Sequence, residues 1–175
     1  MKLRAQLWLP LPPADVFPFF ASAKNLQVIT PEWLDFCIRP PVPASVREGT
    51  RIDYRLRLHR IPLYWQSEIT VWEPPFRFRD EQRRGPYRRW MHTHTFLPHE
   101  GGALCLDEVD YAVPGGAWVE RLFVRQRLRR IFEFRQWALL RHFTSHTADV
   151  VTSTGGPAWQ VTIGEAATGW PAGPN

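Results

Sequence analysis

Hydrophobic and polar residues alternate along several stretches of the chain, which is the pattern of a β-strand with one buried face. The alternation is regular over residues 2–9, 51–58 and 63–72, and residues 103–113 predict a further strand in which both faces are partly apolar. Residues 76–84 and 90–97 predict two further strands joined by a turn at Gly85-Pro86, and residues 33–38 predict another. Strands that follow one another through short turns usually pair antiparallel. The pattern therefore predicts a curved antiparallel sheet of about six to seven strands.

Two short helices are expected directly after the first strand. Pro12 and Pro13 suit the first turn of a helix, and the apolar residues that follow predict a helix over residues 16–20. A second short helix is expected over residues 25–30, where Pro31 ends it because proline cannot continue the hydrogen-bonding ladder.

Residues 117–146 contain no proline or glycine and predict one long C-terminal helix. At a 3.6-residue period, one side of this helix carries Val124, Leu128, Ile131, Phe132, Leu139 and Phe143. Arg125 and Arg135 interrupt that apolar side. A long helix is only marginally stable alone in water, so we expect it to pack on the sheet.

The chain changes character after residue 146. Residues 147–175 are rich in Gly, Pro, Thr and Ala and lack a sustained apolar period, which is typical of a flexible low-complexity tail. Residues 159–163 could pair with an edge strand, although the tail interpretation is favoured. We therefore expect a single domain over residues 1–146, followed by the tail.

The hairpin around Gly85-Pro86 has an unusual inward face. Side chains alternate between the two faces of a strand, so Phe78, Asp80 and Gln82 share one face of the first strand. Trp90, His92, His94 and Phe96 share one face of the second strand. An ordinary core face is apolar throughout, because an unpaired buried polar group costs roughly 1–3 kcal/mol. This mixture of aromatic, acidic and imidazole groups predicts that the face lines an enclosed cavity.

Charge and cysteine usage restrict the partners and the compartment. Lys and Arg together number 22 against 17 Asp and Glu, and the formal net charge is +5. A basic balance permits an anionic membrane surface or nucleic acid as a partner. Two isolated thiols, Cys37 and Cys105, indicate a reducing cytoplasm. The prolines within residues 10–18 argue against a signal peptide, and no apolar run approaches the ~20 residues of a membrane span.

The long helix concentrates the positive charge. The segment contains Arg121, Arg125, Arg127, Arg129 and Arg130, with Phe123 and Trp137 among them. This composition is compatible with transient contact with an anionic membrane surface, and the alternative is a solvated helix face. No nucleic-acid recognition motif accompanies these arginines, so nucleic acid is not expected as a partner.

The order of predicted elements resembles the helix-grip fold of the START-like or SRPBCC superfamily, and the chain is similar to a bacterial SRPBCC family of uncharacterised ligand-binding proteins. The resemblance covers residues 1 to 145. It is carried by Thr30-Pro31, Gly49-Thr50-Arg51-Ile52-Asp53-Tyr54, Ile61-Pro62-Leu63-Tyr64-Trp65, Asp80-Glu81-Gln82, Gly85-Pro86-Tyr87, Trp90-Met91-His92-Thr93-His94, Asp107-Glu108-Val109-Asp110-Tyr111 and Ile131-Phe132-Glu133-Phe134-Arg135.

The resemblance implies an α+β fold whose curved sheet wraps the last helix around a cavity. START-like relatives include lipid carriers, coenzyme Q-binding proteins, hormone receptors and polyketide aromatase/cyclases, so the fold does not select one activity. Some family members are labelled as nucleotide-sugar epimerases. The chain contains no Gly-x-Gly-x-x-Gly turn that would bind a dinucleotide, so that label finds no support in it.

His92 and His94 have the spacing of a two-histidine metal edge, and a third ligand would come from Asp80, Glu68 or Asp107. Two alternatives are that both imidazoles contact a ligand, or that they hydrogen-bond to Asp80, Asp107 or Glu108 within the sheet. We expect neither a metal nor a cofactor. A histidine beside a carboxylate also has the composition of a general acid/base pair.

The favoured hypothesis is non-covalent binding, with transport as an extension, of a small hydrophobic or amphipathic ligand such as a lipid, quinone or polyketide. The predicted ligand-binding residues are Tyr54, Trp65, Phe78, Asp80, Gln82, Trp90, His92, His94, Asp107 and Tyr111. One alternative is an aromatase/cyclase-type enzyme, a polyketide cyclase/dehydratase-like protein with His92 or His94 and Asp80 as acid/base. The other is a structural or partner-binding module without a ligand.

Overall fold

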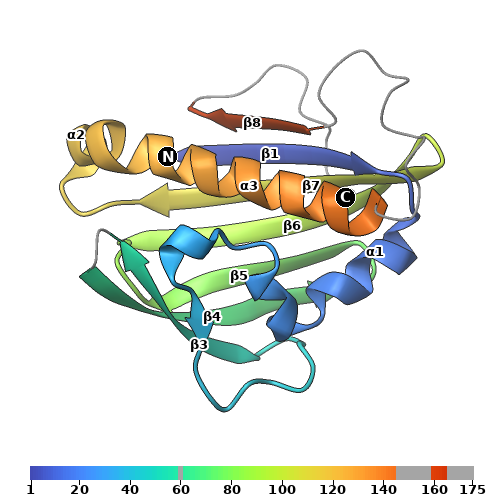
Figure 1. Cartoon of the computed structure of the whole chain (residues 1–175), viewed down its shortest axis with the longest axis horizontal. Coiled ribbons are helices and arrows are strands. Elements are labelled where there is room, and N and C mark those ends of the chain that lie inside the picture. Colours follow the sequence, from blue (N-terminus) through green and yellow to red (C-terminus); the bar gives the residue numbers. More distant parts are fainter. Residues whose placement is uncertain (59–60, 145–158, 165–175) are drawn as a thin grey trace.

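The computed structural model describes residues 1–58, 61–144 and 159–164, which form one antiparallel sheet with helices lying across one face (Figure 1). Within these residues the sheet has eight strands in the order β2-β3-β4-β5-β6-β7-β1-β8. The strands are β1 (Lys2–Leu9), β2 (Cys37–Ile38), β3 (Arg51–Leu58), β4 (Ile61–Glu73), β5 (Arg77–Arg84), β6 (Arg89–His99), β7 (Gly102–Ala112) and β8 (Trp159–Ile163). The predicted α+β helix-grip class is confirmed.

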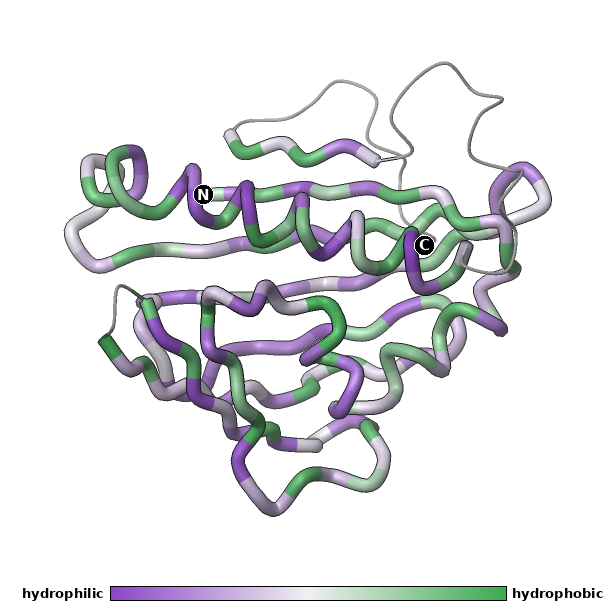
Figure 2. The backbone as a smooth tube through the Cα atoms, viewed as in Figure 1, coloured by the Kyte–Doolittle hydropathy of each residue, from purple (hydrophilic) through white to green (hydrophobic). Residues whose placement is uncertain are grey.

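The alternating pattern identified the buried face of the strands correctly. In β1, Leu3, Ala5, Leu7 and Leu9 are fully buried, whereas the residues between them are partly exposed. Figure 2 shows hydrophilic and hydrophobic positions mixed in this way along the strands. The reason is geometric: one face of each strand meets the helices and the other meets solvent, so burial follows the two-residue period of the strand.

The long C-terminal helix is also confirmed, and it consists of three segments. These are α2 (Gly116–Val119), a π-helical turn labelled η3 (Glu120–Val124) and α3 (Arg125–Thr144). Figure 1 shows α3 running along β1 and β7. Leu128 and Phe132 of α3 lie in one buried cluster with Val109 of β7. None of the helices in the described part of the chain combines the length and the apolar character that a membrane span requires.

The connection from β1 to β3 differs in part from expectation. Two short helices follow β1 as predicted: α1 (Pro13–Phe20) and the 3-10 helix η1 (Ala23–Gln27). The strand expected over residues 33–38 is wrong for its first half, because Glu32–Leu34 forms a further 3-10 turn, η2. Asp35 then adopts a left-handed conformation with φ of 43°, so extended pairing is limited to β2.

The expectation of a flexible tail over residues 147–175 is wrong for residues 159–163. These residues form β8, which pairs antiparallel with the edge of β1 from Leu3↔Ile163 to Leu7↔Trp159. The unpaired N–H and C=O groups of β1 favour addition of a strand there. The remainder of the expected tail and the expected domain boundary at residue 146 lie outside the described residues.

Candidate functional site

A cavity of about 490 Å³ lies between the sheet and the helices that cover it. Side chains of β3, β4, β5 and β6 form one wall, and side chains of α1, η1 and α3 form the other. Most lining residues are apolar or aromatic. Pro114 and Phe123 belong to the lining and are exposed, so the cavity reaches the surface beside η3. We call this opening the mouth of the cavity.

Aromatic rings cover much of the sheet wall. Tyr54 stacks on Trp65 with ring centroids 5.8 Å apart, and Trp65 meets Trp90 edge to face at 5.2 Å. Deeper in the sheet, Phe78 stacks on His94 with centroids 4.0 Å apart. Cross-strand aromatic packing of this kind holds the rings in place, so the wall presents a large apolar surface with few polar tips.

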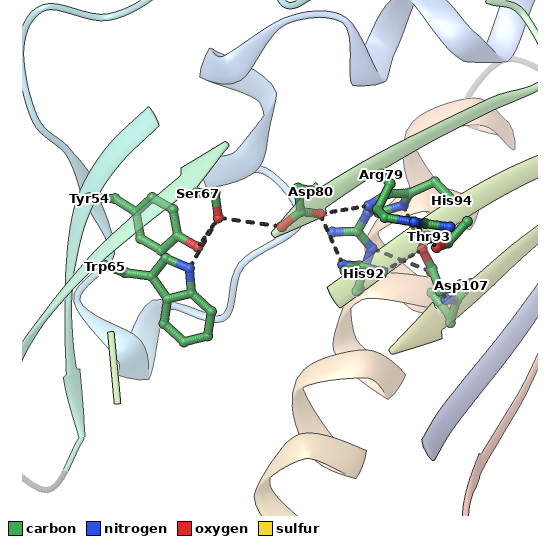
Figure 3. Close-up of polar contacts among 11 residues, drawn as sticks. Tyr54, Trp65, Ser67, Arg79, Asp80, His92, Thr93, His94 and Asp107 are labelled. Carbon is green, nitrogen blue, oxygen red and sulfur yellow. Dashed lines mark hydrogen bonds and ion pairs between the residues drawn. The ribbon is translucent and has the colours of Figure 1, made fainter. Parts of the chain in front are cut away.

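A cluster of charged and imidazole groups interrupts the apolar wall at the centre of the sheet (Figure 3). The register places Asp80 opposite His92, and His94 opposite Asp107. Asp80 Oδ2 lies 3.5 Å from His92 Nδ1 and 3.3 Å from His94 Nε2. Asp107 Oδ1 lies 3.0 Å from His92 Nε2 and 2.7 Å from His94 Nδ1. Each histidine is therefore held between the same two carboxylates.

Helix α3 completes this cluster with two side chains that the sequence reasoning did not assign to the site. Arg135 Nη2 lies 3.4 Å from His94 Nδ1, and Arg135 Nε lies 3.5 Å from Asp107 Oδ2. Gln136 Nε2 donates a hydrogen bond to Asp107 Oδ2 at 3.0 Å. Both side chains are buried. The available signal was that Arg135 interrupts the apolar side of the predicted helix, as a polar residue with a buried partner would.

A second set of hydrogen bonds connects Asp80 to the aromatic wall. Ser67 Oγ accepts a hydrogen bond from Trp65 Nε1 at 3.0 Å and lies 3.2 Å from the Tyr54 hydroxyl. Ser67 Oγ also donates to Asp80 Oδ1 at 3.4 Å. The Asp80 side chain is 18% exposed, and this residue lines the cavity. Asp80 is thus the carboxylate that a molecule inside the cavity would meet.

Burial and neighbouring charges set the protonation of the cluster. Burial lowers the pKa of His92 to about 4, and His94 contributes to the shift while the nearby carboxylates oppose it. Burial alone would raise the pKa of Asp107, but the charge of Arg135 and hydrogen bonds from both histidines hold that pKa well below its usual range. Burial opposes ionisation of Asp80 too, yet the hydrogen bond from His94 keeps its pKa below the ordinary value. At neutral pH the cluster therefore contains two carboxylates, a neutral His92 and a guanidinium.

The cavity brings together most of the predicted ligand-binding residues. Those that line it are Tyr54, Trp65, Phe78, Asp80, Trp90, His92 and His94. Three others lie elsewhere. Gln82 bonds to the backbone of Tyr87 across the β5–β6 turn, and Asp107 lies behind the histidines. Tyr111 is fully buried and donates to Glu120 at 2.8 Å.

The candidate metal ligands separate into two groups. Oxygen and nitrogen atoms of Asp80, His92 and His94 lie within 4.8 Å of one another, close enough to offer three ligands to one ion. Glu68 is excluded, because it pairs with Arg51 and Arg83 on the other face of the sheet. The guanidinium of Arg135 already supplies a positive charge to this cluster, which disfavours a divalent cation.

Glu108, a candidate hydrogen-bond partner of the histidines from the sequence, lies on the outer face of the sheet. Glu108 pairs with Lys2 at 3.0 Å and with Arg4 at 2.9 Å, and it takes no part in the histidine cluster. The neighbouring even-numbered position, Asp110, pairs with Arg89 at 2.8 Å on the same face. The parity of β7 accounts for this difference, since Asp107 faces the helix and the two flanking acidic residues face solvent.

Comparison with known proteins gives a consistent family and fold. The family model described as polyketide cyclase / dehydrase and lipid transport matches residues 9–140. The crystal structure of protein CV1439 from Chromobacterium violaceum is similar, with a TM-score of 0.64 and 15% identity over 81% of this chain and 96% of that chain. Protein Ms6760 from Mycobacterium smegmatis gives a TM-score of 0.61 and 16% identity, covering 82% and 91%. At these identities the similarity shows the fold alone.

A third similar structure is that of the nucleoside-diphosphate sugar epimerase from Corynebacterium glutamicum, with a TM-score of 0.57 and 19% identity. The match covers 79% of this chain but only 28% of that chain. The similarity therefore concerns one part of that larger protein, and it is no evidence that this chain has epimerase activity. A search among curated protein sequences found no significant match.

Proposed function

The chain belongs to the polyketide cyclase/dehydrase and lipid transport family of SRPBCC-type proteins, and on that premise we propose that it binds a small hydrophobic or amphipathic molecule in its cavity. The observation that carries the proposal is the cavity itself, which has an apolar and aromatic lining with one polar cluster. Its volume of about 490 Å³ lies within the range of small-molecule sites. Lipids, quinones and polyketides all have the required combination of a large apolar body and few polar groups.

The lining suggests how such a molecule would be oriented. Its apolar body would lie between Trp65 and Trp90 on the sheet and Phe132 on α3. A hydroxyl or other donor on the ligand would reach Asp80, the partly exposed carboxylate of the cluster. The two histidines are each held between Asp80 and Asp107, so they would fix the position of Asp80 rather than bind the ligand directly.

Binding is favoured over acid/base catalysis for a physical reason. A general base works best when its pKa lies near the operating pH. Burial lowers the pKa of His92 to about 4, which makes it a poor base at neutral pH. An aromatase/cyclase-type reaction remains the second candidate, because Asp80 and His94 both border the cavity at 3.3 Å from one another.

A cavity-filling substitution tests the binding proposal. Leu63 and Tyr64 are neighbours in β4 that face opposite sides of the sheet, and only Leu63 lines the cavity. Leu63→Trp should weaken binding of the fluorescent fatty acid cis-parinaric acid by about tenfold or more, equivalent to about 1.4 kcal/mol. Tyr64→Trp adds bulk on the exposed face and should leave the affinity within about twofold.

Native mass spectrometry of the protein purified without delipidation provides the second readout, in which we expect a bound lipid-like mass. Empty protein across many lipid extracts, together with no probe binding, would overturn the proposal. The catalytic alternative predicts that replacing His92 and His94 by Gln abolishes turnover while ligand affinity stays within about tenfold. A binding protein has no turnover to lose. The cytoplasmic location and the absence of a nucleic-acid partner stay predictions.

A further inference from the structure

Three large apolar side chains are exposed close together beside the mouth of the cavity. Trp118, Leu122 and Phe123 are 78%, 65% and 59% exposed. They fall within six consecutive residues of α2 and η3, at the end of the helix farthest from Thr144 (Figure 1). Single exposed apolar residues are ordinary, but a contiguous group of this kind usually marks an interaction surface. We call these three residues the mouth patch.

This exposure does not come from a loosely held helix end. Glu120, in the middle of the mouth patch, is buried and accepts a hydrogen bond from the Tyr111 hydroxyl at 2.8 Å. Arg125 donates to both carboxylate oxygens of Glu120 at 3.0 Å. These bonds tie η3 to β7, so the apolar side chains are presented on an anchored turn.

The charge around the mouth patch is strongly positive. Arg121, Arg127, Arg129 and Arg130 make no hydrogen bond or ion pair within the described residues. The helical segment 116–144 contains only two acidic residues, and one of them is Glu120, which is already paired. Four guanidinium groups without a partner among the described residues therefore lie on the same helical segment as the exposed apolar side chains.

The mouth patch is continuous with the cavity. Phe123 and Arg127 both line the cavity, as do Val119 and Val124 of the same segment. Trp118 and Leu122 do not line it and extend the apolar surface outward. A molecule entering or leaving through the mouth would pass directly across this surface.

We infer that the mouth patch and its four arginines dock the protein on a bilayer that contains anionic lipid, with the mouth facing the membrane. Trp, Phe and Leu side chains insert readily at the boundary between headgroups and acyl chains. Guanidinium groups pair with lipid phosphates, and each basic residue near an anionic membrane adds to the attraction. A protein partner would need acidic groups placed opposite each arginine, whereas an anionic bilayer supplies them at any register. This docking goes beyond ligand binding in the cavity and does not require it.

Vesicle co-sedimentation of the full chain tests the inference. We expect binding to phosphatidylcholine vesicles containing about 30% phosphatidylserine at about 0.1 M salt, and at least tenfold weaker binding to pure phosphatidylcholine. Trp118→Ser/Leu122→Ser should weaken binding to the anionic vesicles about tenfold. The matched control Tyr64→Ser/Phe76→Ser removes two exposed aromatic side chains that belong neither to the mouth patch nor to the cavity lining, and it should change vesicle binding less than about twofold.

Arg129→Gln/Arg130→Gln provides an independent variant, because neither residue lines the cavity. It should weaken binding to anionic vesicles and reduce its salt dependence. The inference would be overturned if the unmodified chain bound both kinds of vesicle equally. It would also be overturned if neither Trp118→Ser/Leu122→Ser nor Arg129→Gln/Arg130→Gln weakened binding to the anionic vesicles. A change of oligomeric state in Trp118→Ser/Leu122→Ser without a change in vesicle binding would overturn it as well, since the patch would then be a protein interface.

The outcome is separable from that of the cavity proposal. Trp118→Ser/Leu122→Ser should bind cis-parinaric acid in solution as the unmodified chain does, because the substituted side chains lie outside the cavity lining. Loss of vesicle binding with retained probe binding supports docking. If the unmodified chain bound the anionic vesicles but did not bind cis-parinaric acid, the cavity proposal would be refuted and the docking inference would be retained.

Discussion

Protonation of His92 should control how the stability of the protein depends on pH. The imidazole is buried and faces Asp80 on β5, His94 on β6 and Asp107 on β7, while Arg135 of α3 contacts His94 and Asp107. Its pKa falls from an ordinary value of 6.5 to about 4, chiefly through burial. Between these two values the unfolded chain binds one more proton at this site than the native protein does. The free energy of unfolding should therefore decrease as the pH is lowered from about 6.5 to about 4.

The size of the effect follows from the shift in pKa. Because a tenfold change in a protonation equilibrium corresponds to about 1.4 kcal/mol, the difference between a pKa of 6.5 and one of about 4 contributes about 3 kcal/mol of stability at pH 7 that is absent at pH 4. The depressed pKa values of Asp80 and Asp107 act in the same direction but at lower pH. A loss centred between pH 6.5 and pH 4 is thus assigned to the histidine.

Urea unfolding followed by tryptophan fluorescence at several pH values measures this loss. His92→Gln removes the titrating group but keeps an N–H that can donate to Asp107. This variant should lose about 3 kcal/mol less than the unmodified chain between pH 7 and pH 4. His99→Gln replaces an exposed histidine of the same strand and serves as the matched control, with the pH dependence of the unmodified chain.

Parallel loss of stability in the unmodified chain and in His92→Gln would refute this reasoning. A direct check comes from NMR titration of the His92 imidazole, which should remain neutral down to about pH 5. Protonation of His92 near pH 6.5 would show that the imidazole is solvated or stabilised as a cation, contrary to the buried arrangement between the strands and α3.

Three further predictions concern other parts of the molecule. Glu120→Ala should lower the free energy of unfolding by about 1–3 kcal/mol in urea titrations, because it removes a buried acceptor that binds Tyr111 and Arg125; an unchanged midpoint would contradict this. Cys37 is exposed and should react quickly with a thiol reagent, whereas Cys105 should react only after unfolding, because burial raises the pKa of its thiol. Equal reaction rates of the two thiols in the folded protein would contradict the burial of Cys105. Dialysis against EDTA should leave the melting temperature and the affinity for cis-parinaric acid unchanged, and a drop in either would point to a metal at the strand histidines.

Local patterning determined the sheet and the inward face of the central hairpin. The two-residue alternation identified seven of the strands, although only Cys37–Ile38 of the stretch expected over 33–38 is extended. Parity alone predicted that Asp80, His92 and His94 would share a face, and register then placed Asp80 opposite His92. Such predictions succeed because the pleat repeats every two residues whatever the rest of the fold does.

Long-range packing decided the rest of the site. Nothing local to residues 135–136 shows that Arg135 and Gln136 meet Asp107, because that contact depends on how α3 crosses the sheet. The same applies to Tyr111, whose hydroxyl donates a hydrogen bond to Glu120 and which does not line the cavity. The sequence alone determined which side chains point inward. Only the tertiary structure decided which inward groups neutralise one another and which remain facing the cavity, because charges on separate elements pair according to distance in space.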